Sequence, residues 1–226
     1  MKLSNKILIG FFGFIFLYLT AAFAELRMTG IPNIIDESNS IAETVDIAGV
    51  THFKINDIDK DINIIGSDKA QLEVLSFSGD VLKKLTYKIS GDTLTLSGLQ
   101  SEGIKTMKIS VFIPKSGLKG ITVNNSTVNI LHLHSDLLDI VQNAGNIWMS
   151  DSEIGNMNLS LANCVLEISG STVDSLSAKS ENSRVNIYSS VRVVQGSIAD
   201  ETIMYITDLE EIQMKKDKTS VLRVNQ

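Results

Sequence analysis

The sequence lacks most of the residues that cross-link or interrupt a chain. Its 226 residues include one cysteine, Cys164, and two prolines, Pro32 and Pro114. A single cysteine excludes an internal disulfide framework. Long helical periodicity is absent after Ala24, where short alternating runs rich in Ile, Val, Leu and Thr are separated by Asn, Ser, Gly and Asp. This pattern predicts an all-β fold that is stabilised by core burial and backbone pairing.

Basic residues are scarce relative to acidic ones. The chain has 20 lysines and arginines against 26 aspartates and glutamates, and its formal net charge is −6. Such an acidic surface repels phosphate backbones and anionic lipid head groups. We therefore expect no nucleic-acid partner.

One long hydrophobic run is present, and it lies at the N-terminus. Two lysines in residues 1–6 precede 18 uncharged residues, 7–24, which end in Ala22-Phe23-Ala24. This small-x-small ending is the pattern that signal peptidase accepts, so we predict that residues 1–24 are a secretory signal peptide. The alternative is an uncleaved anchor in the inner membrane, with residues 7–24 as the tether. Either way we expect export of the remainder, to the periplasm, outer membrane or cell surface. Cleavage would leave 202 residues with a net charge of −8.

A period of 19 residues runs through the C-terminal half. The hexapeptide "NSTVNI" at 125–130 returns as "NSRVNI" at 182–187, which is three periods later. Two apolar columns and one outward, mostly polar column between them follow the same step. They are Val128, Ile147, Leu166, Val185 and Met204; Ile130, Met149, Ile168, Ile187 and Ile206; and Asn129, Trp148, Glu167, Asn186 and Tyr205. Residues two apart share one face of a strand, so both apolar columns face inward.

A second strand and a corner repeat with the same period. The strand is predicted at Leu138, Met157, Leu176 and Met214, with Gln195 as the exception, beside a column of Ile140, Leu159, Ala178 and Ser197. The corner has Asn125, Asn163 and Asn182 in one column, with Ala144 and Glu201 in the other turns. The next column is small throughout: Ser126, Gly145, Cys164, Ser183 and Thr202. Asparagine tolerates the left-handed conformation of a sharp bend, and stacked asparagines can hydrogen-bond from coil to coil.

Matching columns at one period predict strands stacked in parallel. We therefore predict a parallel β-helix, or β-solenoid, with coils of about 19 residues over 115–226. Residues 45–114 are rich in predicted strands but do not keep the period, and we interpret them as an irregular N-terminal β cap of the same domain, 45–226. Residues 25–44 have no clear period and are predicted to be a linker.

Three segments carry a family resemblance. They are "VDIAGVTHFKINDIDKDINIIGSDKAQLEV", "GDTLTLSG" and "KISVFIPKSGLKGITVNNSTVNI". In pattern more than in identities, residues from Val45 to the C-terminus resemble the head GIN domain, a bacterial envelope domain named as an autotransporter adhesin head. Members often have Ser-Gly-Ala-Gly at the corner where this chain has Asn-Asn-Ser-Thr. The resemblance implies a cap followed by β-helical coils, but the family is a domain of unknown function and offers no catalytic residues to transfer.

The candidate chemical groups are few. His132 and His134 are two residues apart, with Asp136 and Asp139 nearby, and we expect surface or turn histidines in preference to a metal site. His52 is isolated. The acidic residues Asp151, Glu153, Glu167 and Asp174 occur singly, without the paired carboxylates of β-helical polysaccharide hydrolases. We therefore predict no enzyme activity, metal or cofactor.

Two aromatic residues are the one functional hint on the predicted rod. Trp148 and Tyr205 share the outward column three coils apart, and exposed aromatic rings serve in sugar binding. The simpler expectation is that each ring covers apolar neighbours. The resemblance to an adhesin head, together with this hint, implies an adhesin-like module that binds a glycan or a surface protein. The first alternative is a structural envelope module that self-associates, and the second is a carbohydrate-active enzyme. Cys164 is expected to be buried and inert, and "KKDK" at 215–218 to be a solvated turn before a last strand at 221–224.

Overall fold

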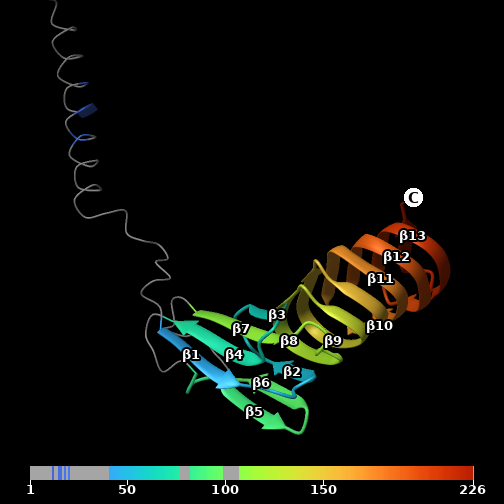
Figure 1. Ribbon diagram of the computed structural model, residues 1–226. Coiled ribbons are helices and arrows are strands. Elements are labelled where there is room, and N and C mark those ends of the chain that lie inside the picture. The colour runs from blue at the N-terminus through green and yellow to red at the C-terminus, as the bar shows by residue number, and fades with distance from the viewer. Residues whose placement is uncertain are drawn as a thin grey trace, which may run out of the picture. The chain divides into compact units, whose positions relative to one another are not determined.

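The structure is a computed structural model (Figure 1). It describes residues 41–76, 82–98 and 107–225, together with Phe12, Ile15, Phe16, Tyr18 and Thr20. The chain divides into two compact units, Met1–Ser40 and Ile41–Gln226. The described residues of the first unit are helical, but nowhere in the described part of the chain is a helix long and apolar enough to cross a membrane. The predicted signal peptide or anchor, and residues 25–40 of the predicted linker, lie outside the residues that can be described further.

The second unit is made of β-strands, as predicted. Its strands are β1 (Ile41–Asp46), β2 (His52–Asn56), β3 (Ile62–Ser67), β4 (Gln71–Ser76), β5 (Thr86–Ser90), β6 (Thr93–Ser97), β7 (Met107–Pro114), β8 (Gly120–Leu131), β9 (His134–Ser150), β10 (Glu153–Ala162), β11 (Val165–Glu181), β12 (Arg184–Ala199), β13 (Ile203–Lys216) and β14 (Val221–Val224). β1 takes in residues 41–44, which the sequence assigned to the linker. These four residues pair with β4 and so belong to the sheet.

β8 to β13 form a stack of parallel coils. Val128 pairs with Ile147, Leu166 with Val185, and Val185 with Met204, each 19 residues apart along the chain. All five residues of this predicted column are fully buried. Figure 1 shows the successive coils laid side by side from β8 to β13. The predicted β-solenoid is therefore confirmed.

Each coil has three sides, which the buried positions reveal. In the coil that begins at Asn146, the inward residues form three alternating runs: Ile147 and Met149; Ser152 and Ile154; Met157, Leu159 and Leu161. Alternation breaks between the runs because the chain turns there. We call the segments equivalent to 146–150 the first side, those equivalent to 152–154 the second side, and those equivalent to 157–161 the third side. The first and third sides carry most of the core.

The corner before the first side is left-handed in every coil. Asn125, Asn163 and Asn182 have φ of 48°, 53° and 46°, and the residues at the other turns, Ala144 and Glu201, also have positive φ. Apart from glycine, asparagine is among the residues that tolerate this conformation best, which explains why it dominates the column. The predicted side-chain stacking is present as well, since Asn182 Nδ2 donates a hydrogen bond of 2.8 Å to Asn163 Oδ1.

The small residues that follow this corner do more than fit a tight space. The backbone N–H of Cys164 donates to Ser183 Oγ in the next coil at 3.2 Å, and the N–H of Ser183 donates to Thr202 Oγ1 at 3.3 Å. A second hydroxyl ladder runs through Ser152, Ser171 and Ser189 at the corner before the second side. Corner N–H groups turn away from the strand ladder, and a buried N–H without a partner is costly. The hydroxyls of the next coil supply the missing acceptors.

The predicted register of the third side is wrong for the last two coils. Leu176 pairs with Val194, and Val194 pairs with Ile212, so Gln195 and Met214 do not belong to this column. The neighbouring column continues from Ala178 to Gly196 instead of Ser197. Both steps are 18 residues because, at the corner between the first and second sides, β12 has one residue fewer than β11 and β13 has one fewer than β12. An additional residue at Asp200-Glu201, where both φ values are positive, restores the step of 19 on the first side.

The N-terminal cap contains two further parallel layers in an order that differs from the chain. β2 pairs in parallel with the start of β8, and β3 with its end, so β2 and β3 form the layer before the first regular coil. β6 and β7 then pair in parallel with β2 and β3 on the opposite edge. The stack therefore continues two layers beyond the predicted coils. Antiparallel strands end it: β5 beside β6, and β4 followed by β1 beside β7.

Candidate binding surface

The outward face of the first side carries the predicted aromatic column. Asn129 pairs with Trp148, Trp148 with Glu167, and Asn186 with Tyr205, as the period predicted. The Trp148 side chain is 40 % exposed, while Tyr205 is half-buried. Three strand spacings separate the two rings, or about 14 Å along the stack. Glu167 and Asn186 lie between them with polar groups that can donate to or accept from a ligand.

A second tyrosine, missed in the sequence, completes this face. Tyr188 is 45 % exposed and lies two residues beyond Asn186 on the same side. Its ring centroid is 5.7 Å from that of Tyr205, with an angle of 55° between the planes. Such tilted pairs are favourable and hold both rings in place. The period could not reveal it, because the column that leads to Tyr188 holds Ser150 and Ser169, which are small and polar.

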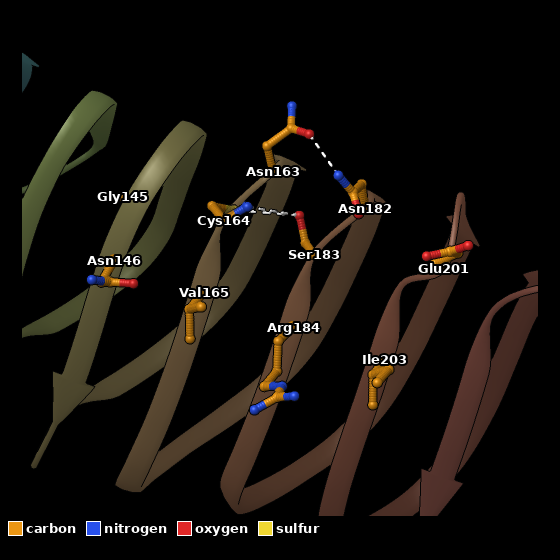
Figure 2. Close-up of a pocket in the computed structure, with 10 residues that line it drawn as sticks. All are labelled: Gly145, Asn146, Asn163, Cys164, Val165, Asn182, Ser183, Arg184, Glu201 and Ile203. Atoms are coloured by element: carbon orange, nitrogen blue, oxygen red, sulfur yellow. Dashed lines mark hydrogen bonds between the residues drawn. The ribbon is translucent and has the colours of Figure 1, made fainter.

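An open hollow of about 500 Å³ borders the aromatic face. Asn146, Val165, Arg184 and Ile203 line it from the outward position that precedes the aromatic column, while Asn163, Asn182 and Glu201 line it from the corner. Figure 2 shows Asn163 and Asn182 joined at the corner, with Arg184 between Val165 and Ile203 in successive coils. Arg184 offers several N–H donors and Glu201 offers acceptors, so both hydroxyl and carboxylate groups have partners here.

Cys164 belongs to the wall of this hollow but is buried, as predicted. Its side chain is 5 % exposed, and its sulfur lies 3.5 Å from Ser183 Oγ. Burial raises the pKa of the Cys164 thiol, which keeps it protonated and unreactive. Gly145 occupies the equivalent position one coil earlier with φ of 85°, and a Cβ there would overlap the carbonyl of Ser126. The column therefore requires small residues, and Cys164 has a structural role.

The two neighbouring histidines lie at a different corner. His132 has φ of 57° and forms the bend, and His134 Nδ1 lies 2.8 Å from Glu153 Oε2 in an exposed pair. Both line a second hollow of about 490 Å³ with Lys115 and Asp151. Among the described residues, no group of three or more His, Cys, Asp and Glu side chains could hold a metal ion. His132 lies at the bend and His134 begins β9, and both are exposed, in agreement with the prediction of surface or turn histidines.

His52 is less isolated than the sequence indicated. Its Nδ1 lies 3.1 Å from Asp92 Oδ2 and 2.9 Å from Thr51 Oγ1. A catalytic relay needs the carboxylate on one ring nitrogen and the hydroxyl on the other, so that the ring carries a proton between them. Here both partners share one nitrogen. Hydrogen bonds lower the pKa of the Asp92 carboxyl, the one from Thr51 most strongly, followed by those from Thr93 and His52. The contacts of Asp92 with Thr51 and His52 tie the β5–β6 turn to the start of β2. The distances assign the cluster a structural role.

Comparison with known proteins supports the fold. No protein-family model matches the chain, and no curated protein matches it in sequence. The resemblance to the head GIN domain therefore stays a prediction. Among solved structures, one described as a putative adhesin from Bacteroides fragilis has a TM-score of 0.60 and 17 % identity, and the match covers 83 % of this chain and 93 % of that one. Another, described as a putative lipid binding protein from Parabacteroides distasonis, has a TM-score of 0.50 and 15 % identity, with 83 % and 96 % covered. At these identities, the chain shares its fold with solved bacterial proteins that include one described as a putative adhesin.

Proposed function

We propose that the protein is an exported, non-enzymatic binding module of adhesin type, and that it binds glycans on the first side of its coils. The observation that carries the proposal is the aromatic face: Trp148, Tyr188 and Tyr205 are presented on one rigid sheet, with polar residues between them. Aromatic rings cover the apolar faces of a sugar, and the polar groups beside them bind its hydroxyls. The spacing of Trp148 and Tyr205 suits an extended oligosaccharide better than a single sugar.

Rigidity supports the same proposal. Trp148 and Tyr205 stand on strands that are paired on both edges, and Tyr188 pairs with Ser169 and packs against the ring of Tyr205. Little order therefore has to be gained on binding. The hollow beside Arg184 and Glu201 extends the face with charged groups of both signs. A ligand that lies across the coils would therefore contact aromatic, amide, guanidinium and carboxylate groups on neighbouring coils.

A glycan array tests the proposal. We expect the wild-type protein to bind a restricted set of oligosaccharides, and Trp148→Ala and Tyr188→Ala to weaken that binding by roughly tenfold or more, as expected for aromatic anchors. The matched control is Val141→Ala. Val141 is 46 % exposed but lies on the third side, so its replacement should leave binding unchanged.

Two outcomes would contradict the proposal. One is the absence of any specific glycan binding, and the other is equal binding by the control and by both aromatic variants. Release of reducing ends from a polysaccharide would favour the alternative of a carbohydrate-active enzyme.

Export is tested separately, at the N-terminus. N-terminal sequencing of the protein from the cell envelope should begin at Glu25 if residues 1–24 are a cleaved signal peptide. A chain that begins at Met1 and fractionates with the inner membrane would support the anchor alternative. A protein that stays in the cytoplasm would contradict both.

A further inference from the structure

The C-terminal end of the stack has a long strand edge that no described strand covers. β14 pairs only with Ile203–Ile206, on the first side, and no described strand pairs with the far edge of residues 208–216. The core is uncovered at this edge. Ile212 is 41 % exposed, whereas Val194, Leu176 and Met157, which precede it in the column, are fully buried. An edge strand with unpaired backbone groups and exposed apolar side chains is a template for another strand.

The residues along this edge are arranged symmetrically about Gln213. By their pairing with β12, Ile212 and Met214 point inward, and Glu211, Gln213 and Lys215 point outward. The acidic residue therefore lies two positions before Gln213 and the basic residue two positions after it, on the same face. In the single chain Glu211 accepts a hydrogen bond of 2.7 Å from Gln213, and no ion pair between described residues involves Glu211 or Lys215.

We propose that the third-side edge of β13 pairs with the same edge of a second copy of this chain, antiparallel and with Gln213 on the two-fold axis. Residues that face each other across an antiparallel pair point to the same side of the sheet. This register places Ile212 opposite the partner's Met214, so apolar side chains meet on the inner face. It also places Glu211 opposite the partner's Lys215 on the outer face, and symmetry produces each contact twice.

Neighbouring two-fold registers fit poorly. An axis at Ile212 places Glu210 opposite the partner's Met214, and an axis at Met214 places Ile212 opposite the partner's Lys216. Each sets a charge against an apolar side chain, which is unfavourable on a face that becomes buried. The pattern of the edge thus selects one register.

The charges could instead serve to keep other strands away, because lysines often protect exposed edges. Protection needs charges that repel an incoming copy. Here an antiparallel copy presents opposite charges at both outward positions, so the charges attract it. Because the charges are complementary in this way, a second copy of the chain is the partner that fits this edge.

Charge reversal tests the proposal with the full chain in mild detergent. Sedimentation should show a monomer–dimer equilibrium that weakens at high salt. Glu211→Lys or Lys215→Glu alone should raise the dissociation constant on the order of tenfold or more, because each places like charges opposite each other twice. The double variant E211K/K215E should dimerise like the wild type, and a mixture of the two single variants should form a heterodimer. These side chains are exposed, so equal melting temperatures will show that the variants are folded.

A cysteine on the axis tests the register. Gln213→Cys should form an intermolecular disulfide on mild oxidation, because an axial residue faces its own copy within the roughly 7 Å between Cα atoms that a disulfide allows. The matched control is Lys215→Cys, whose two Cα atoms would lie about 14 Å apart. A wild-type protein that is monomeric at every concentration, a dimer indifferent to both charge reversals, or equal cross-linking of the two cysteine variants would overturn the proposal.

Discussion

Ile168 illustrates how single residues hold the coils together. It is fully buried and pairs with Met149 on one edge and with Ile187 on the other. We expect Ile168→Ala to cost roughly 2–5 kcal/mol in the free energy of unfolding, because a large side chain is removed from a packed column. Ile168→Asp should prevent folding, since its charge would have no partner there. Urea unfolding measures the first effect. A soluble Ile168→Asp protein with a cooperative transition would contradict the inward orientation.

Asn163 tests whether the corner is selected for its backbone or for its side chain. Its φ of 53° is readily adopted by asparagine and glycine but not by a β-branched residue. Asn163→Val should therefore lower the melting temperature more than Asn163→Gly. Both variants lose the acceptor for Asn182 Nδ2, so that loss cancels in the comparison. Equal losses would mean that the side-chain hydrogen bond decides the choice of residue.

Asp217 makes the last turn sensitive to acid. Its carboxylate accepts hydrogen bonds from the N–H of Ser220 at 2.8 Å and of Asp200 at 2.9 Å, and from Thr219 Oγ1 at 2.9 Å. These bonds, from Ser220 first and then Asp200, hold the pKa of Asp217 well below its ordinary value of 3.8. Because the pKa of Asp217 is lower in the folded state than in the unfolded state, its carboxylate stabilises the folded protein at any pH above the ordinary pKa. This contribution is lost as the pH falls below about 4. Asp217→Asn should thus lower the melting temperature at neutral pH, and the difference from wild type should shrink in acid. A constant difference would contradict this account.

At the scale of an element, the coil is the unit that the structure repeats. Deleting Ala162–Ser180 joins Leu161 to Glu181, which occupies the position equivalent to Ala162 in the next coil. The shortened stack should fold and lose stability by about one coil and its interface. Deleting only 162–179 joins Leu161 to Ser180, two inward positions in succession, and should fail because a one-residue slip inverts the faces. Circular dichroism and thermal melting compare the two. Equal behaviour would mean that the 19-residue coil is not the unit.

The structure itself shows where a coil can lose a residue. β12 is one residue short at a corner, and the strands on both sides of that corner keep their inward positions. Strict counting by 19 cannot detect such a change, and it therefore misplaced Gln195, Ser197 and Met214. On the first side the count stays correct through Tyr205, because the lost residue is restored at Asp200-Glu201. Corners tolerate a change in length that strands do not.

The sequence was least informative where pairing is not sequential. The strands of the cap were recognisable from alternation, but their order was not, because β2 pairs with residues 41 positions later in β6 and 68 positions later in β8. No period relates these steps, so the partner of each strand is decided by tertiary packing.

Only those residues of the candidate surface that follow the period could be predicted from the sequence. Trp148 and Tyr205 share a column that repeats, whereas Tyr188 becomes visible only once its ring is seen beside Tyr205.

At the scale of the whole solenoid unit, the two ends differ in how they are built. Antiparallel strands continue the stack at the N-terminal end, whereas at the C-terminal end the third-side edge of the parallel strand β13 has no partner among the described strands. Amide exchange should therefore be slowest in the middle layers and fastest in β13 and β14, because opening starts where few contacts must break. Hydrogen exchange detected by mass spectrometry, at a concentration below that of dimer formation, measures this gradient. Uniform protection from β8 to β14 would show that the stack opens as one unit.

The position of β2 and β3 between later strands also affects the order in which the chain can fold during synthesis. This pair leaves the ribosome before β6, β7 and β8, yet it has β6 and β7 on one edge and β8 on the other. Neither edge can be satisfied until at least residue 97 has been made, and the second edge needs residue 131. Contacts between distant segments form slowly, and unpaired strands are prone to aggregate meanwhile. β2 and β3 must therefore wait for the first regular coil before both of their edges are paired.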